Sequence, residues 1–149
     1  MREVIIQLIT AFLGSLGFAM LFQLKNRLLL AASLGGLINW GVYLLAAHFT
    51  GGDFVPCFIS AAAAVMYCEL TARLLKAPIT LFLVPAIIPS VPGGSLFYTM
   101  SNAVQKNWQE VRDFGLKTAE FALGIAAGVC LAVAIFGIVN TIVHNSRKG

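Results

Sequence analysis

The chain has 149 residues, of which 59% are hydrophobic and only 11% charged, and its mean hydropathy is +0.89. Soluble globular domains carry roughly a quarter charged residues, so this chain has too little polar surface for a water-soluble fold. A bilayer solvates apolar side chains directly, and the composition therefore predicts an integral membrane protein in contact with lipid. The net charge of +4 includes no basic stripe with interleaved aromatics, so we expect no nucleic-acid partner.

Five apolar stretches are long enough, or nearly so, to cross a bilayer as helices, which takes about 20 residues each. The expected spans are approximately 4–24, 28–50, 54–75, 77–105 and 121–143, with the fourth broken near 89–94. These stretches predict an all-α fold, a polytopic membrane helical bundle of about five transmembrane helices. A single transmembrane domain would then cover residues 1–149.

Basic residues in the connections indicate how the chain is oriented, because cytoplasmic loops are enriched in Lys and Arg. With five crossings, one side of the membrane would hold Lys25, Arg27, Arg73, Lys76, Arg147 and Lys148. The other side would hold Arg2, Lys106, Arg112 and Lys117. This bias predicts an external amino terminus and a cytoplasmic carboxyl terminus. A re-entrant hairpin in the fourth stretch would change the parity.

Segment 106–120 differs from the spans because its charges recur every three or four residues. Lys106, Glu110, Asp113, Lys117 and Glu120 share one helical face. This pattern is typical of an amphipathic helix at the membrane surface, where an aromatic side chain such as that of Trp108 would lie among the lipid headgroups. A solvated helical connection with internal ion pairs is the alternative.

Small residues predict where the helices approach each other closely, since lipid tails are as apolar as leucine and give no hydrophobic drive. Gly124 and Gly128 form a GxxxG pair in the fifth span. We expect them to pack against another helix, either in this chain or in a homo- or hetero-oligomer. Asn39 and Asn140 are expected to hydrogen-bond between helices.

The fourth stretch contains the pattern that most strongly indicates a function. Pro85, Pro89 and Pro92 each remove a backbone donor and crowd the carbonyl four residues earlier, and Gly93 and Gly94 follow directly. The helix should therefore break near residues 89–94. In hydrocarbon, a broken backbone is tolerated only against protein or a water-filled cavity.

Beyond the break, Ser95 is expected to be the N-cap of a second half-helix, with free N–H groups and the positive end of the helix dipole at its start. Transporters use such discontinuous helices to bind the carboxylates of their substrates. We therefore expect a small anionic or zwitterionic solute to bind here. The predicted substrate-binding residues are Pro89, Pro92, Gly93, Gly94, Ser95, Tyr98 and Asn102. A proline kink that only shapes the bundle is the alternative.

Glu69 is the one carboxylate well inside an apolar stretch, and Arg73 follows one helical turn later. Intramembrane ionisable residues often relay protons or ions, so these two residues are candidates for proton or ion coupling. A paired carboxylate near the cytoplasmic end of the span is the simpler interpretation.

No catalytic motif is present: the sequence has no GxSxG, HExxH or P-loop, and we expect no enzyme. Cys57, Cys68 and Cys130 show no metal-ligand spacing with each other or with the two histidines. We expect neither a metal site nor a cofactor.

Three stretches carry a resemblance to a known family. Residues 88–95 read IPSVPGGS and resemble the I-P-x-x-P-G signature in the carboxyl-terminal transmembrane half of the threonine/serine exporter family. Residues 17–22, GFAMLF, are similar to the early G-F-A-x-x-F stretch of that half, and residues 34–37 fit its second span. The resemblance covers nearly the whole chain.

The resemblance implies a secondary exporter of small hydroxy amino acids, threonine or serine, or of dicarboxylates such as succinate in split relatives. The chain is similar to the separate small membrane subunit of such a split exporter. This implies a larger companion membrane subunit and a bacterial inner-membrane location. Two other classes stay open: a membrane scaffold or assembly subunit without a solute pathway, and a homo-oligomeric pore. A scaffold has no need for exposed backbone, and a channel would more often show rings of charged residues.

Overall fold

The computed structural model describes residues 2–24 and 27–146, and the side chains as far as residue 139. Its elements are α1 (Arg2–Leu21), α2 (Arg27–Phe49), α3 (Phe54–Leu75), α4 (Thr80–Ile87), η1 (Ile88–Ser90), α5 (Gly93–Val104) and α6 (Trp108–Ser146). The described part of the chain is all-helical, as the sequence predicted. Lys25, Arg147, Lys148 and the side chain of Asn140 lie outside the described residues.

Four helices, α1, α2, α3 and α6, are long and apolar enough to cross a membrane. A fifth candidate consists of α4 with η1 and α5, which are bent by 53° relative to each other. Pro85 is tolerated inside α4, but Pro89 lies in a short 3-10 turn and Pro92 precedes α5. The predicted break in the fourth span is confirmed, and its cause is the loss of backbone donors at these prolines.

The helices α3 and α6 pack with their backbones in close contact. A Cβ added to Gly124 would lie 2.6 Å from the Phe54 carbonyl oxygen, and one added to Gly128 would collide with the Phe58 carbonyl oxygen. The predicted helix-packing role of both glycines is therefore filled inside this chain, by the backbone of α3. Because 54 faces 124 and 58 faces 128, the two helices run in the same direction.

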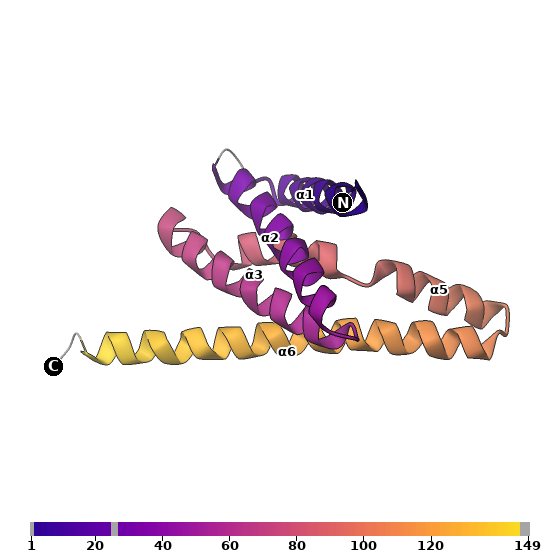
Figure 1. Cartoon of the computed structure of the whole chain (residues 1–149). Coiled ribbons are helices and arrows are strands. Elements are labelled where there is room, and N and C mark those ends of the chain that lie inside the picture. Colours follow the sequence, from indigo (N-terminus) through magenta and orange to yellow (C-terminus); the bar gives the residue numbers. More distant parts are fainter. Residues whose placement is uncertain (1, 25–26, 147–149) are drawn as a thin grey trace.

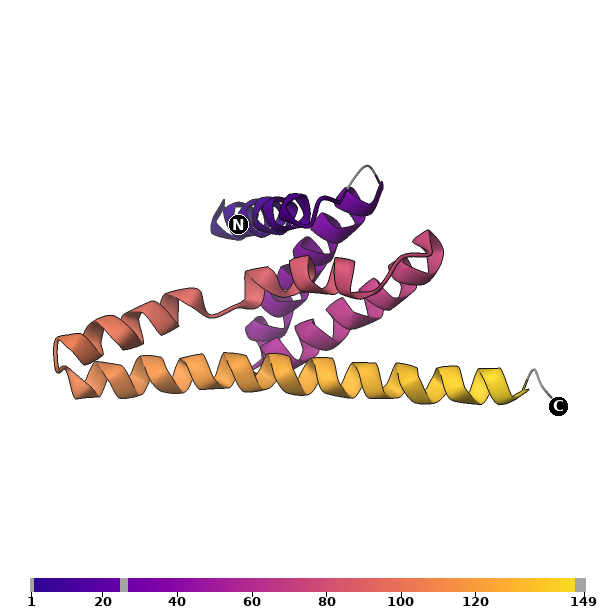
Figure 2. The same ribbon diagram turned by 180° about the vertical axis from the view of Figure 1, so that it is seen from behind.

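The parallel arrangement of α3 and α6 constrains the path of the chain between them. The segment formed by α4, η1 and α5 must return from the end of α3 to a point beyond its start, where α6 begins. In Figures 1 and 2 the chain follows this path: α4 lies beside α2 and α3, and α5 continues past the start of α3. Asn39 contacts Ala86 and Ser90, which places α2 directly against the end of α4.

The expected separate helix over residues 106–120 is not observed. Trp108–Ser146 is one continuous helix of 39 residues, or about 58 Å at 1.5 Å per residue, so the charged segment and the fifth span are parts of the same element. Gly115, the glycine in the charged segment, lies within the helix without ending it. The first third of α6 packs antiparallel against α5, and the two form a helical hairpin that is visible in both views (Figures 1 and 2).

Candidate functional site

The break itself consists of two residues that leave the helical conformation. Val91 is extended, with φ −64° and ψ 124°, and Pro92 has φ −77° and ψ 55°. Pro92 is the N-cap of α5, so the expectation that Ser95 caps this helix is wrong. Neither Gly93 nor Gly94 has a positive φ, and both join the helix, so its N-cap lies three residues earlier than expected. Ser95 instead donates from its hydroxyl to the Pro92 carbonyl at 3.2 Å.

The start of α5 leaves backbone donors open. Gly93 N–H donates to the Val91 carbonyl at 2.8 Å, and Leu96 N–H makes the first helical bond, to the Pro92 carbonyl at 3.0 Å. Among the described residues, no acceptor pairs with the N–H groups of Gly94 and Ser95. A Cβ built on Gly93 or Gly94 would meet nothing within 4 Å, so the backbone here is uncovered. Such helix starts bind anions readily.

Asn39, fully buried on α2, holds the other side of the break in place. Its side-chain amide donates to the Ala86 carbonyl at 2.9 Å and to the Ser90 hydroxyl at 2.8 Å. Both acceptors lie where the prolines interrupt the regular ladder, so a side chain from another helix supplies a donor to this interrupted backbone. The expected interhelical role of Asn39 is confirmed.

A cavity of about 430 Å³ lies against the break, and we call it the break cavity. It is lined by Trp40, Tyr43, Asp53, Pro89, Ser90, Val91, Pro92, Gly93, Gly94, Ser95, Tyr98, Phe114, Lys117 and Phe121. Six of the seven predicted substrate-binding residues are therefore brought together around one space. The seventh, Asn102, is not among the lining residues, and its amide donates to the carbonyl of Tyr98 at 2.9 Å.

Two opposite charges line the break cavity without pairing with each other. Asp53 lies in the connection before α3 and accepts a 3.0 Å hydrogen bond from the hydroxyl of Tyr43. Lys117 is exposed on α6, and no carboxylate of the described residues lies within 4 Å of its ammonium group. The cavity thus offers an acceptor and a cation together with the free N–H groups of Gly94 and Ser95.

Aromatic side chains form the remaining walls. Tyr43 stacks on Trp40 with ring centroids 4.8 Å apart and tilts against Phe121 at 5.7 Å. On the other side, Tyr98 stacks on Phe114 at 5.2 Å, which joins α5 to α6. These contacts fix the side chains that border the polar groups.

Sequence reasoning missed the residues that α2, the α2–α3 connection and α6 contribute. The sequence places Lys117 on the polar face of a surface helix, yet in the structure Lys117 lines the break cavity together with Phe114 and Phe121 of the same helix. Asp53 and Tyr43 lie ten residues apart on either side of a turn, which was a usable signal: a charged residue after one span and a tyrosine in its last two turns. Trp40 carries no such signal in the sequence.

Glu69 and Arg73 form the predicted ion pair, with Arg73 Nη2 2.9 Å from Glu69 Oε1. Arg73 also lies over the ring of Phe136, 5.9 Å from its centroid. Glu69 is 16 residues along α3 from Asp53, or about 24 Å at 1.5 Å per residue, and the pair does not line the break cavity. No group of three or more potential metal-ligating side chains occurs among residues 2–24 and 27–139, whose side chains the structure describes.

No solved structure matches the chain. The family model described as "Threonine/Serine exporter, ThrE" matches residues 7–135, which include every residue that lines the break cavity. That match extends over most of the sequence and includes most of α1, all of α2 to α5 and the greater part of α6. The chain therefore belongs to the threonine/serine exporter family.

Proposed function

We propose that this chain is a subunit of a secondary transporter that exports small hydroxy amino acids or dicarboxylates across a bacterial inner membrane. The single observation that carries the proposal is the break cavity, where uncovered N–H groups of α5 meet a free lysine. A solute carboxylate fits this position because helix starts and ammonium groups both stabilise negative charge. Charge-assisted hydrogen bonds of this kind are short and about twice as strong as neutral ones.

The negative charge of Asp53 distinguishes between the two candidate solute classes. A zwitterion such as threonine places its carboxylate at Lys117 and the start of α5, and its ammonium group at Asp53. A dicarboxylate such as succinate would bring a second negative charge toward Asp53, and like charges at close range are unfavourable. The charge arrangement therefore favours threonine and serine over succinate.

A larger companion membrane subunit completes the proposed transporter. None of the residues of α5 is buried, and α5 packs mainly on the first third of α6, so the outer faces of this hairpin are open. Lys117 and the two glycines of the break are also exposed. A second membrane subunit placed here would close the break cavity and exclude lipid from its polar groups.

Five crossings follow from the same proposal. The parallel packing of α3 and α6 favours a fourth segment that crosses the membrane over one that turns back. With the basic residues distributed as in the sequence, the amino terminus lies outside and the carboxyl terminus in the cytoplasm. A reporter fused after the last residue tests this topology.

Efflux from cells that lack related exporters tests the proposed function. The cells are loaded with threonine or serine dipeptides, or grown to accumulate succinate, and express this chain with and without the companion subunit. We expect export of threonine or serine only when both proteins are present. Export by this chain alone would point to a homo-oligomeric carrier or pore. No export of either solute class from a confirmed membrane complex would contradict the proposal and favour a scaffold.

Replacing Asp53 tests the proposed preference for threonine over succinate. Asp53→Asn removes the charge that binds an ammonium group, and we expect about a 10-fold or larger loss of affinity for threonine, since hydrogen bonds to charged groups contribute about 1.5–3 kcal/mol. Succinate transport, if present, should not weaken. The matched control is Asp113→Asn, an exposed carboxylate of α6 that does not line the cavity.

A further inference from the structure

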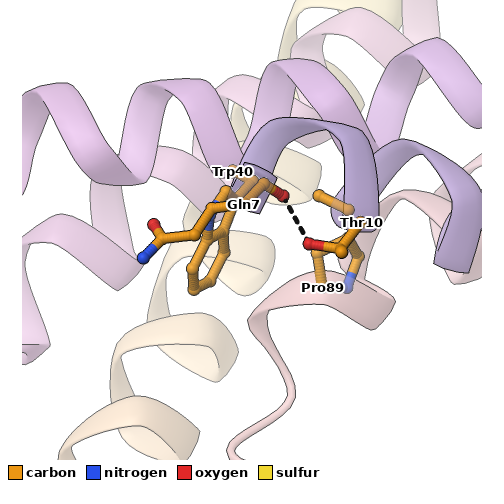
Figure 3. A pocket seen from close by; sticks show the side chains of 5 residues that line it. Gln7, Thr10, Trp40 and Pro89 are labelled. Atoms are coloured by element: carbon orange, nitrogen blue, oxygen red, sulfur yellow. Dashed lines mark hydrogen bonds between the residues drawn. The ribbon is translucent and has the colours of Figure 1, made fainter. Parts of the chain in front are cut away.

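A second, smaller pocket lies next to the break cavity, on the side of α1. It has a volume of about 220 Å³ and is lined by Gln7, Thr10, Ala11, Trp40 and Pro89 (Figure 3). Trp40 and Pro89 line both this pocket and the break cavity. Space, and not close-packed side chains, therefore lies on both sides of these two residues.

We propose that Trp40 determines the largest solute that the break cavity accepts, because its indole closes the cavity on the side of α1. This inference rests on the proposed function and deepens it by naming a specificity-determining residue. Pro89 is part of the backbone break and cannot leave its position without moving η1. The indole is a side chain on a continuous helix, so its removal joins the two spaces without disturbing the break.

The position of the indole is fixed from the side of the break cavity. Its ring stacks on Tyr43 at 4.8 Å, and Tyr43 is itself anchored by the 3.0 Å hydrogen bond to Asp53. The wall is therefore connected to the residue that we propose binds the ammonium group. Stacked aromatic pairs contribute stability beyond the area that they bury, so the ring resists displacement by a larger solute.

The space behind the indole can accept polar atoms. Figure 3 shows the side-chain amide of Gln7 beside the ring, and the Thr10 hydroxyl donates to the Gln7 carbonyl at 2.9 Å. A polar ligand that enters this space can therefore hydrogen-bond to the Gln7 amide, which both donates and accepts.

Removal of the indole should therefore lengthen the list of accepted solutes and leave the small ones transported. The experiment measures export of threonine and of glutamine, a larger amino acid with a polar side chain, in cells where the wild-type transporter exports threonine. For Trp40→Ala we expect the preference for threonine over glutamine to fall by at least about tenfold, the lower bound for a pocket contact that excludes extra methylenes. Trp40→Phe keeps a ring and should keep most of the preference.

Two controls separate this effect from a general loss of packing. Trp108→Ala removes a tryptophan that is 68% exposed on α6 and lines neither pocket, and the preference should not change. Ala11→Met, introduced together with Trp40→Ala, refills the space behind the wall and should restore the preference for threonine. If that double variant restores it, the single variant was folded and the gain of glutamine export came from the added volume.

Each outcome assigns a failure to one of the two claims. If the wild-type transporter exports neither an amino acid nor succinate, the proposed function fails. If it exports threonine and Trp40→Ala keeps the wild-type preference, the proposed function stands and the assignment of Trp40 is wrong. The assignment is also wrong if Trp40→Ala loses export of both amino acids and the double variant regains neither.

Discussion

Two glycine pairs in this chain face opposite surroundings. Gly124 and Gly128 lie on α6 against the carbonyl oxygens of Phe54 and Phe58, and an added Cβ at either position would overlap the backbone of α3. Gly93 and Gly94 lie at the start of α5, where an added Cβ would meet nothing within 4 Å. The first pair brings two helices together, and the second leaves a helix start bare.

The absence of a side chain allows close helix packing at the first pair and leaves the backbone accessible at the second. In a membrane, close approach of backbones substitutes for the hydrophobic drive that lipid removes. An uncovered backbone is unfavourable in lipid unless a cavity or another protein faces it. The contact between α3 and α6 should therefore determine whether the chain folds, and the start of α5 should determine whether it transports a solute.

Gly128→Leu should have the largest effect, because it forces α3 and α6 apart. We expect a loss of about 3 kcal/mol or more in stability, at the upper end for overpacking, and little folded protein in the membrane. Thermal unfolding of the purified protein in detergent, followed by size-exclusion chromatography, measures this. The matched control is Gly14→Leu, since a Cβ at Gly14 meets nothing within 4 Å. A stable Gly128→Leu protein would mean that α3 and α6 do not pack as described.

Gly94→Leu should abolish transport while the protein stays inserted and folded. The new side chain occupies the break cavity and covers the free N–H groups, so we expect export to fall by more than about tenfold, the usual effect of one lost charged hydrogen bond. Gly94→Ala should reduce export less. Efflux normalised to the amount of protein in the membrane measures the effect, and wild-type export by Gly94→Leu would contradict the site.

Asn39→Ala tests whether the break is held by α2. It leaves the Ala86 carbonyl buried without its donor, which costs about 1–3 kcal/mol. We expect a lower thermal stability together with weaker transport, because the lining residues Pro89 and Ser90 lose their anchor. The matched control is Asn102→Ala, which removes an amide that bonds only within α5. Equal stability of these two variants would argue against the anchor.

Glu69→Gln should have the smallest effect. The partner Arg73 is 47% exposed, and ion pairs with exposed partners contribute less than about 1 kcal/mol. We expect nearly unchanged stability and threonine export, because the pair lies far from the break cavity. A loss of proton-driven export with normal threonine binding would instead assign Glu69 to coupling.

The helices and the break could be predicted because each leaves a local signal. Apolar length gives the spans, and Pro89, Pro92 and the adjoining glycines mark a place where the backbone ladder cannot continue. The GxxxG pair likewise identified a packing face. Six of the seven predicted substrate-binding residues line one cavity because they are neighbours along a single short stretch, so no tertiary information was needed.

The remaining features depend on tertiary contacts that a sequence does not reveal. The charged segment before the fifth span continues into it as one helix, because nothing in the segment breaks it and α5 packs beside it. Lys117, Asp53 and Trp40 reach the cavity only because α2 and α6 approach the break from two sides. Ser95 failed as an N-cap because Gly93 and Gly94 adopt the helical conformation and the helix starts before it.

A solute that binds at the start of α5 should protect a cysteine placed there from chemical labelling. Ser95→Cys is introduced where Cys57, Cys68 and Cys130 have been replaced, and its reaction with a small thiol reagent is followed in membranes. A cysteine at Gly14 serves as the control. We predict that excess threonine slows labelling at position 95 and not at position 14. Labelling of position 95 that is unaffected by threonine, in a variant that still exports it, would contradict the account.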